Sequence, residues 1–126
     1  MKQQRPGVLL TRRLFPEVLQ RLSVHFEVRD NPDDAVWTPA ELIERLQGQW
    51  GVLATQGERI DATVLAACPQ LRVVANMAVG FNNLDLEALA RHGVQASNTP
   101  DVLTESTADF GLALLLATAR RISEGE

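Results

Sequence analysis

The segment from Ala78 to Asn83 has the composition of a ligand-binding loop set between two regular elements. It reads Ala-Val-Gly-Phe-Asn-Asn and separates an apolar strand pattern from a charged, amphipathic helix pattern. A glycine lets the backbone approach a ligand, and the N–H groups around Val79 and Gly80 can then face an anion just before a helix begins. The pattern predicts a backbone site for a small carboxylate or phosphate. A structural turn with Gly80 in a left-handed conformation explains the same spacing, and both interpretations stay open.

The other side chains that could do chemistry have structural explanations. His92 is expected at a helix C-terminus, which the helix dipole favours, and Cys68 is expected in the core without the basic partner of a nucleophile. Thr104 fits a helix N-cap, or alternatively a ligand contact at the cleft edge. The sequence has no metal-ligand spacing, no G-x-G-x-x-G and no P-loop. We therefore assign no catalytic residue and no metal ligand.

Short apolar strand patterns alternate strictly with helix patterns along the chain. Strands are predicted over residues 7–11, 24–29, 50–55, 71–77 and 94–98, and helices over 15–23, 38–48, 61–68, 83–93 and from about 104 onward. Strict alternation is typical of an α/β fold whose parallel sheet is covered by helices on both faces. Ligands bind such sheets beyond the carboxyl ends of the strands, where the loop at Gly80 falls.

Composition and charge argue against several classes of protein. The chain has 126 residues, of which 45% are hydrophobic, enough for one domain with its own core. The net charge of -4 and the lack of a basic block argue against nucleic acid and anionic membranes as partners. The longest apolar run, residues 110–119, is too short to span a bilayer. A single cysteine and no signal peptide predict a cytoplasmic protein.

The last helix pattern is the longest and most apolar element of the chain. Leu112, Leu115, Leu116 and Ala119 form a stripe with helical spacing. Because an apolar terminal helix needs a partner surface, we expect a homo-oligomer, namely a dimer formed through this helix.

Residues 71–121 resemble the D-isomer-specific 2-hydroxyacid dehydrogenases, in particular the glyoxylate/hydroxypyruvate/2-ketogluconate reductase branch. The motifs V-G-F-N-N-L-D and N-T-P-D-V-L-T-E-S-T-A-D carry the resemblance, although the family commonly has Asp at the position of Asn82. It implies a flavodoxin-like substrate domain over residues 1–100, present here in its N-terminal part. Residues 101–126 would form a long helix crossing toward a Rossmann domain that binds NAD(H) or NADP(H). The family's Gly-rich loop and catalytic Arg, Glu and His lie beyond this chain, which is expected to be an inactive fragment that binds no coenzyme.

The resemblance also implies roles for individual residues. Val79 and Gly80 match the loop whose backbone N–H groups hold the carboxylate of a small 2-oxo acid, and Val79 also borders the coenzyme. Gln56 matches a position beside the substrate pocket, and Leu103 matches a position in its wall. Thr107 matches the threonine near the nicotinamide carboxamide. The implied reaction is the reduction of a 2-oxo acid to a D-2-hydroxy acid.

A second class of function is a stand-alone flavodoxin-like binding or dimerisation module without enzymatic activity. A receiver domain of this kind would carry acidic residues after the first and third strands, and a flavodoxin would carry a Ser/Thr/Gly-rich phosphate loop after the first. The chain has LLTRRLF and VLATQGER at these places, which fit neither pattern.

Overall fold

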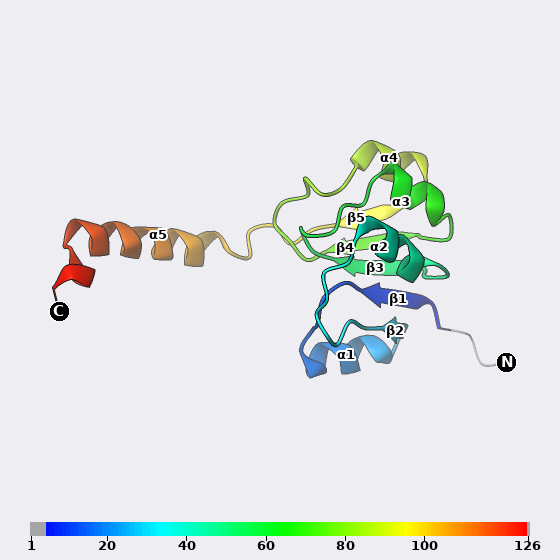
Figure 1. Ribbon diagram of the computed structural model, residues 1–126, viewed down its shortest axis with the longest axis horizontal. Coiled ribbons are helices and arrows are strands. Elements are labelled where there is room, and N and C mark those ends of the chain that lie inside the picture. The colour runs from blue at the N-terminus through cyan, green and yellow to red at the C-terminus, as the bar shows by residue number, and fades with distance from the viewer. Residues whose placement is uncertain (1–4, 126) are drawn as a thin grey trace.

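Short apolar segments build a five-stranded parallel sheet in the computed structural model, which describes residues 5–125 (Figure 1). The strands are β1 (Gly7–Leu10), β2 (Glu27–Arg29), β3 (Gly51–Ala54), β4 (Val73–Asn76) and β5 (Gln95–Ser97). The helices are α1 (Pro16–Ser23), α2 (Pro39–Leu46), α3 (Ala62–Ala67), α4 (Leu86–Arg91) and α5 (Thr104–Ala119), and a 3-10 turn follows at Ile122–Glu124. The predicted α/β alternation is confirmed.

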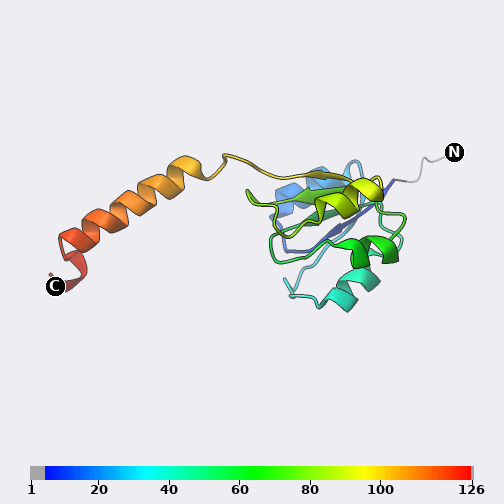
Figure 2. The same ribbon diagram turned by 90° about the horizontal axis from the view of Figure 1, so that it is seen from above.

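The strand order is β2-β1-β3-β4-β5, and every neighbouring pair is parallel. This is the order of flavodoxin-like sheets, so that prediction is confirmed too. Figures 1 and 2 show α1 on one side of the sheet and α2 and α3 on the other, with α5 leaving from the edge where the strands end. A ligand site at the carboxyl ends therefore lies near the start of the segment leading to α5.

The main core lies between the sheet and helices α2, α3 and α4. Leu9, Val52 and Val74 are in register across β1, β3 and β4, and each is almost fully buried. They pack in one cluster with apolar residues of the three helices, among them Leu42, Leu65 and Leu89. Burying one such side chain contributes about 1.5–3 kcal/mol, so this cluster holds the three strand ends at fixed spacing.

Side-chain caps explain where helices α2, α3 and α4 start. The Thr38 hydroxyl accepts a hydrogen bond from the N–H of Glu41 at 3.3 Å, and the Glu41 carboxylate accepts from the N–H of Thr38 at 2.8 Å. This capping box precedes Pro39 at the first helical position. Asp61 caps α3, and Asp85 caps α4.

Most predicted elements are shorter in the structure than the sequence pattern indicates, and for two of them the backbone shows the reason. The strand expected over residues 24–29 begins only at Glu27, because the N–H groups of His25 and Phe26 bond to the Leu22 carbonyl and prolong the turn of α1. The helix expected to run to the chain end stops at Ala119. Arg121 follows with a φ of 51°, a left-handed conformation that a helix cannot continue through.

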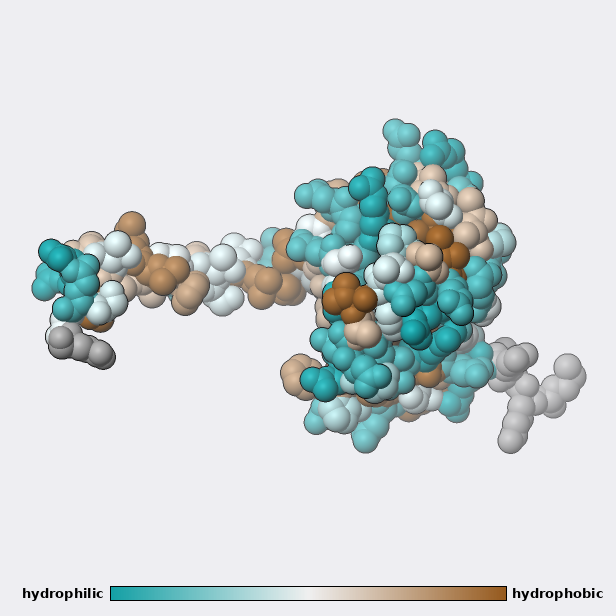
Figure 3. All heavy atoms as spheres, in the orientation of Figure 1, coloured by the Kyte–Doolittle hydropathy of each residue, from teal (hydrophilic) through white to brown (hydrophobic). Residues whose placement is uncertain are grey.

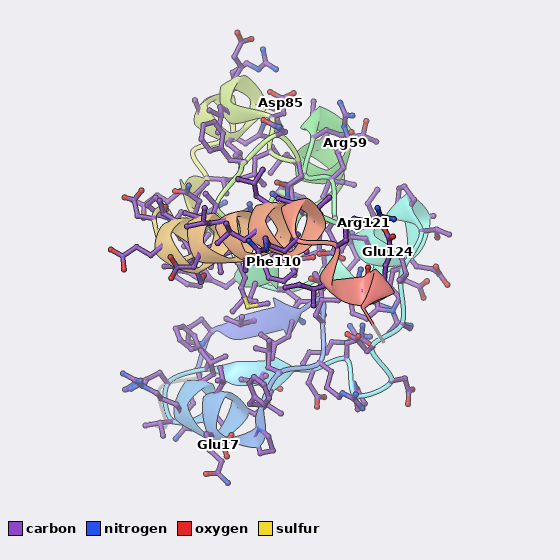
Figure 4. All side chains as sticks on the ribbon, turned by 90° about the vertical axis from the view of Figure 1, so that its left-hand side faces the viewer. Glu17, Arg59, Asp85, Phe110, Arg121 and Glu124 are labelled. Carbon is purple, nitrogen blue, oxygen red and sulfur yellow. The ribbon has the colours of Figure 1, made fainter. Side chains whose placement is uncertain are left out.

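Helix α5 extends away from the sheet, with apolar side chains exposed along it (Figures 1 and 3). Figure 4 looks from the side to which α5 projects and labels Phe110 on this helix; Arg121 and Glu124 lie side by side and form an ion pair in the turn after it. Exposed apolar residues include Phe110, Leu112, Leu114, Leu115 and Leu116. The predicted stripe of Leu112, Leu115, Leu116 and Ala119 lies exposed on one side of the helix, and Phe110 and Leu114 add apolar surface on the other side.

Candidate functional site

The loop from Met77 to Asn83, called the Gly80 loop below, follows β4 at the carboxyl edge of the sheet. Three consecutive carbonyl oxygens in it are hydrogen-bonded to the protein. The Ala78 carbonyl accepts from the Thr99 N–H at 2.9 Å, and the Val79 carbonyl accepts from Asn98 Nδ2 at 2.8 Å. The Gly80 carbonyl accepts from Asn76 Nδ2 at 3.0 Å. The acceptors of this loop are therefore turned toward the body of the domain.

Two backbone N–H groups of the same loop are not hydrogen-bonded within the described residues. Within residues 5–125, the N–H groups of Val79 and Gly80 donate to no acceptor of the protein. Val79 is 41% exposed and Gly80 is half-buried, so this part of the loop lies at the surface. Adjacent free N–H groups next to tied carbonyls can donate two hydrogen bonds to one carboxylate, and such charge-assisted bonds are stronger than neutral ones.

Gly80 does not adopt the left-handed conformation that a purely structural turn would require. Among the described glycines, only Gly48 and Gly93 have a positive φ. A Cβ on Gly80 would instead lie 2.9 Å from Nε2 of Gln56, on the loop after β3. A side chain at position 80 would therefore meet only the flexible end of Gln56, and the left-handed interpretation is wrong.

Asn83 joins these two loops through its side chain. Its Nδ2 donates to the carbonyls of Thr55 and Glu58, at 2.9 Å and 3.0 Å. Asn76, which is 2% exposed, exchanges side-chain hydrogen bonds with Asn83 and also holds the Gly80 carbonyl. The position of Gly80 is therefore set by the side-chain pair of buried Asn76 and half-buried Asn83, a contact that the sequence pattern does not indicate.

The buried carboxylate of Glu58 holds the loop after β3 in place. Glu58 is 6% exposed and accepts from the hydroxyls of Thr11 and Thr55, at 2.8 Å and 2.9 Å, and from the Thr55 N–H at 2.8 Å. Arg12 Nε lies 3.4 Å from its other oxygen. These contacts satisfy the charge and fix the loop that carries Gln56. Sequence reasoning missed this cluster because a charged residue in a loop is normally solvated.

The remaining predicted site residues lie on α5 or just before it. Leu103 precedes the first residue of α5 and is 56% exposed, and Thr107 is exposed one turn later. The structure therefore brings together Val79, Gly80 and Gln56 but leaves Leu103 and Thr107 on the projecting segment; their roles stay predictions.

The predicted N-cap at Thr104 is wrong. Leu103 holds the N-cap position, Thr104 is the first helical residue, and no side-chain hydrogen bond caps α5.

Other reactive side chains show structural contacts. His92 Nδ1 bonds the Ala88 carbonyl at 2.8 Å at the end of α4, as its predicted position indicates. Burial raises the pKa of the Cys68 thiol, which disfavours the thiolate. Within residues 5–125, no group of three or more His, Cys, Asp or Glu residues could hold a metal ion. In the same part of the chain, no helix has the length and apolar character needed to cross a membrane.

Comparison with known proteins gives consistent matches. The family model described as D-isomer specific 2-hydroxyacid dehydrogenase, catalytic domain, matches residues 8–122. The chain is 43% identical over 122 residues to a glyoxylate reductase of Thermococcus kodakarensis, covering 97% of this chain and 37% of the relative. A solved structure of a Thermus thermophilus protein matches with a TM-score of 0.81 and 43% identity, over 94% of this chain and 38% of that chain.

A further matching structure was solved with ligands bound. It is an NADPH-dependent glyoxylate/hydroxypyruvate reductase of Sinorhizobium meliloti in complex with NADP and malonate, with a TM-score of 0.67 and 31% identity. The match covers 97% of this chain and 39% of that chain. The chain thus spans little more than a third of the length of the proteins it matches.

Proposed function

The chain belongs to the D-isomer specific 2-hydroxyacid dehydrogenase family, and from this premise we propose that it supplies the carboxylate-binding part of an NAD(P)-dependent oxidoreductase. The proposed reaction reduces a small 2-oxo acid, of the glyoxylate, hydroxypyruvate or 2-ketogluconate type, to a D-2-hydroxy acid. One observation carries the proposal. The carbonyls of Ala78, Val79 and Gly80 are bound to the protein, whereas the N–H groups of Val79 and Gly80 have no acceptor among the described residues.

A carboxylate at the Gly80 loop would accept from both free N–H groups. Two hydrogen bonds to a charged group contribute about 3–6 kcal/mol together, which corresponds to affinity on the order of millimolar for a ligand of this size. Gln56 borders the same position, because its amide lies against Gly80. We propose that Gln56 lines the substrate pocket and that Leu103 forms part of its wall.

The chain provides only an edge of a coenzyme site. Val79 and Thr107 are exposed, but Thr107 lies on the projecting α5, and the sequence contains no Gly-rich phosphate loop. These residues do not form a dinucleotide site, so the proposal assigns them only a contact with the nicotinamide end of NAD(H) or NADP(H). We expect the 126-residue chain to bind no dinucleotide and to turn over no substrate on its own.

Titration of the isotope-labelled chain with oxamate tests the carboxylate site. Oxamate has the carboxylate and 2-oxo group of a substrate, whereas oxamide is its neutral analogue. We expect oxamate to shift the amide resonances of Val79 and Gly80 in a saturable manner, and oxamide or added chloride to leave them in place. Equal responses to oxamate and oxamide, or a response spread evenly over the chain, would refute a carboxylate site here.

A chimera tests the proposed activity of the whole protein. Residues 8–122 would replace the matching segment of the Thermococcus kodakarensis glyoxylate reductase, to which this chain is 43% identical. We expect the chimera to reduce glyoxylate with a nicotinamide coenzyme while the isolated chain does not. Turnover by the isolated chain, or a folded chimera that binds coenzyme but is inactive, would contradict the proposal.

We also propose that α5 pairs with a second copy of the chain. Its apolar residues are exposed on all sides, which is typical of a helix that becomes buried in an assembly. The double variant Leu115→Gln, Leu116→Gln should shift light-scattering mass toward the monomer. The matched control Val24→Gln, Val36→Gln removes equally exposed apolar residues elsewhere and should not. A wild-type monomer at high concentration would contradict the proposal.

The alternative function is a stand-alone flavodoxin-like module. The strand order fits such a module, but the residues after β1 do not support it. Thr11 lies directly after β1; its hydroxyl donates to Glu58, and its backbone carbonyl accepts from Asn31 Nδ2 at 3.0 Å. Thr11 is therefore engaged in internal contacts rather than in a phosphate loop. A flavin-bound, yellow preparation would favour this alternative. We propose a cytoplasmic location, on the basis of the single, buried and unpaired Cys68.

A further inference from the structure

The segment after β5 holds the Gly80 loop by two hydrogen bonds. The Thr99 N–H donates to the Ala78 carbonyl at 2.9 Å, and Asn98 Nδ2 donates to the Val79 carbonyl at 2.8 Å. These two residues precede the turn that leads into α5. The loop that carries the free N–H groups is thus tied to the segment from which the projecting helix starts.

The geometry of the peptide bond means that a hydrogen bond to a carbonyl also fixes the direction of the N–H group of the next residue. In a planar trans peptide, the C=O of one residue and the N–H of the next point in opposite directions. The described chain has no cis peptide bonds. A donor on the Val79 carbonyl therefore fixes the direction of the Gly80 N–H, and the donor on the Ala78 carbonyl fixes the Val79 N–H in the same way.

Asn98 differs from the buried asparagines of the site. Asn76 is 2% exposed and bonds both Gly80 and Asn83, so it also stabilises the domain. Asn98 makes its side-chain hydrogen bond at the surface, and the Val79 carbonyl is its acceptor. This hydrogen bond joins residues 19 apart in the sequence. Replacing the Asn98 side chain should therefore change the stability of the core little, but it should change the orientation of the peptide between Val79 and Gly80.

We propose that Asn98 is a positioning residue that aims the Gly80 N–H at the substrate carboxylate by holding the Val79 carbonyl. The inference rests on the proposed function, because it assigns Asn98 a role at that same carboxylate site. It also couples the site to α5: a displacement of the segment at Asn98 and Thr99 rotates the peptides whose N–H groups bind the ligand.

The test compares three variants of the full chain by NMR. Asn98→Ala removes the donor, Asn98→Gln keeps an amide donor on a longer stem, and Asn82→Ala removes an exposed asparagine of the Gly80 loop whose side chain makes no hydrogen bond in the described structure. The ligand-free readouts are the carbonyl carbon shift of Val79 and the amide nitrogen shift of Gly80. The ligand-bound readout is the dissociation constant for oxamate, measured at the Gly80 amide.

Asn98→Ala is expected to move both ligand-free shifts and to weaken oxamate binding about three- to tenfold, the effect of losing one neutral hydrogen bond. Asn98→Gln should lie between this variant and wild type, and Asn82→Ala should match wild type. The proposal is overturned if Asn98→Ala leaves the Val79 and Gly80 shifts unchanged, or if its oxamate affinity equals that of Asn82→Ala. If oxamate does not affect wild-type Gly80, the proposed function fails, while the ligand-free shifts still decide whether Asn98 orients this peptide.

Discussion

Replacing Asn83 by alanine tests whether the two loops of the site are held together by one side chain. Asn83 Nδ2 donates to the carbonyls of Thr55 and Glu58 and to Asn76 Oδ1, at 2.9, 3.0 and 3.1 Å. Its Oδ1 accepts from Asn76 Nδ2 at 3.2 Å. Alanine removes all of these bonds and leaves two backbone carbonyls without this donor.

The magnitude follows from the number of bonds. A typical intramolecular hydrogen bond contributes about 0.5–1.5 kcal/mol net, and an acceptor left unpaired in a partly buried site costs more. Asn83→Ala should therefore lower the free energy of unfolding by about 2–4 kcal/mol. Urea unfolding followed by the fluorescence of Trp37 and Trp50 measures it. The exposed neighbour Asn82 is the control, and Asn82→Ala should change the same quantity by less than about 0.5 kcal/mol.

Two results would refute this reasoning. The first is an unfolding free energy for Asn83→Ala within error of that for Asn82→Ala. The second concerns Asn83→Asp, which replaces the donor by an oxygen facing three acceptor oxygens. At neutral pH this variant should be no more stable than Asn83→Ala, so a more stable Asp variant would show that the donor role is wrong.

Further predictions concern glycine, a cap and a thiol. Gly80→Ala should change the unfolding free energy by less than about 1 kcal/mol, because only the flexible end of Gln56 must move, but should weaken oxamate binding in the NMR titration. Hydrogen bonding from the Thr38 backbone holds the pKa of Glu41 below its usual value. This contribution to stability is present above the usual glutamate pKa and lost as pH falls through the lowered one, so Glu41→Gln should flatten the acid dependence of urea unfolding. Burial raises the pKa of Cys68, so stability should fall as pH rises above the usual thiol pKa, and Ellman's reagent should react fast only in denaturant.

The parts of the fold that depend on local residue types could be predicted from the sequence. Thr38 before a proline, with Glu41 three residues later, is a local signal for a helix start, and the structure has the capping box there. The alternation of strand and helix patterns along the chain likewise predicts a parallel sheet. Strands that are apolar throughout need helices on both faces of their sheet. The position of Gly80 at the strand ends follows from that topology.

The contacts that organise the site could not be predicted, because their partners are distant in sequence. Asn83 reaches the Thr55 carbonyl 28 residues back, and Glu58 accepts from Thr11 across 47 residues. The acceptors are mostly backbone groups, which carry no residue-type signal. Residues 24–26 show that a local pattern can also mislead. Their alternation suggests a strand, but hydrogen bonds from His25 and Phe26 to the Leu22 carbonyl keep this stretch in the turn after α1.

The projection of α5 has a consequence for synthesis on the ribosome. All five strands and the helices that cover them lie between Gly7 and Ser97, while α5 follows them and is exposed along nearly its whole length. Domains generally fold as units, N-terminal part first, as the chain emerges. The nascent sheet can therefore reach its final topology before α5 leaves the exit tunnel. The apolar helix then emerges after the core of this domain is complete, so the surface that covers it lies outside that core.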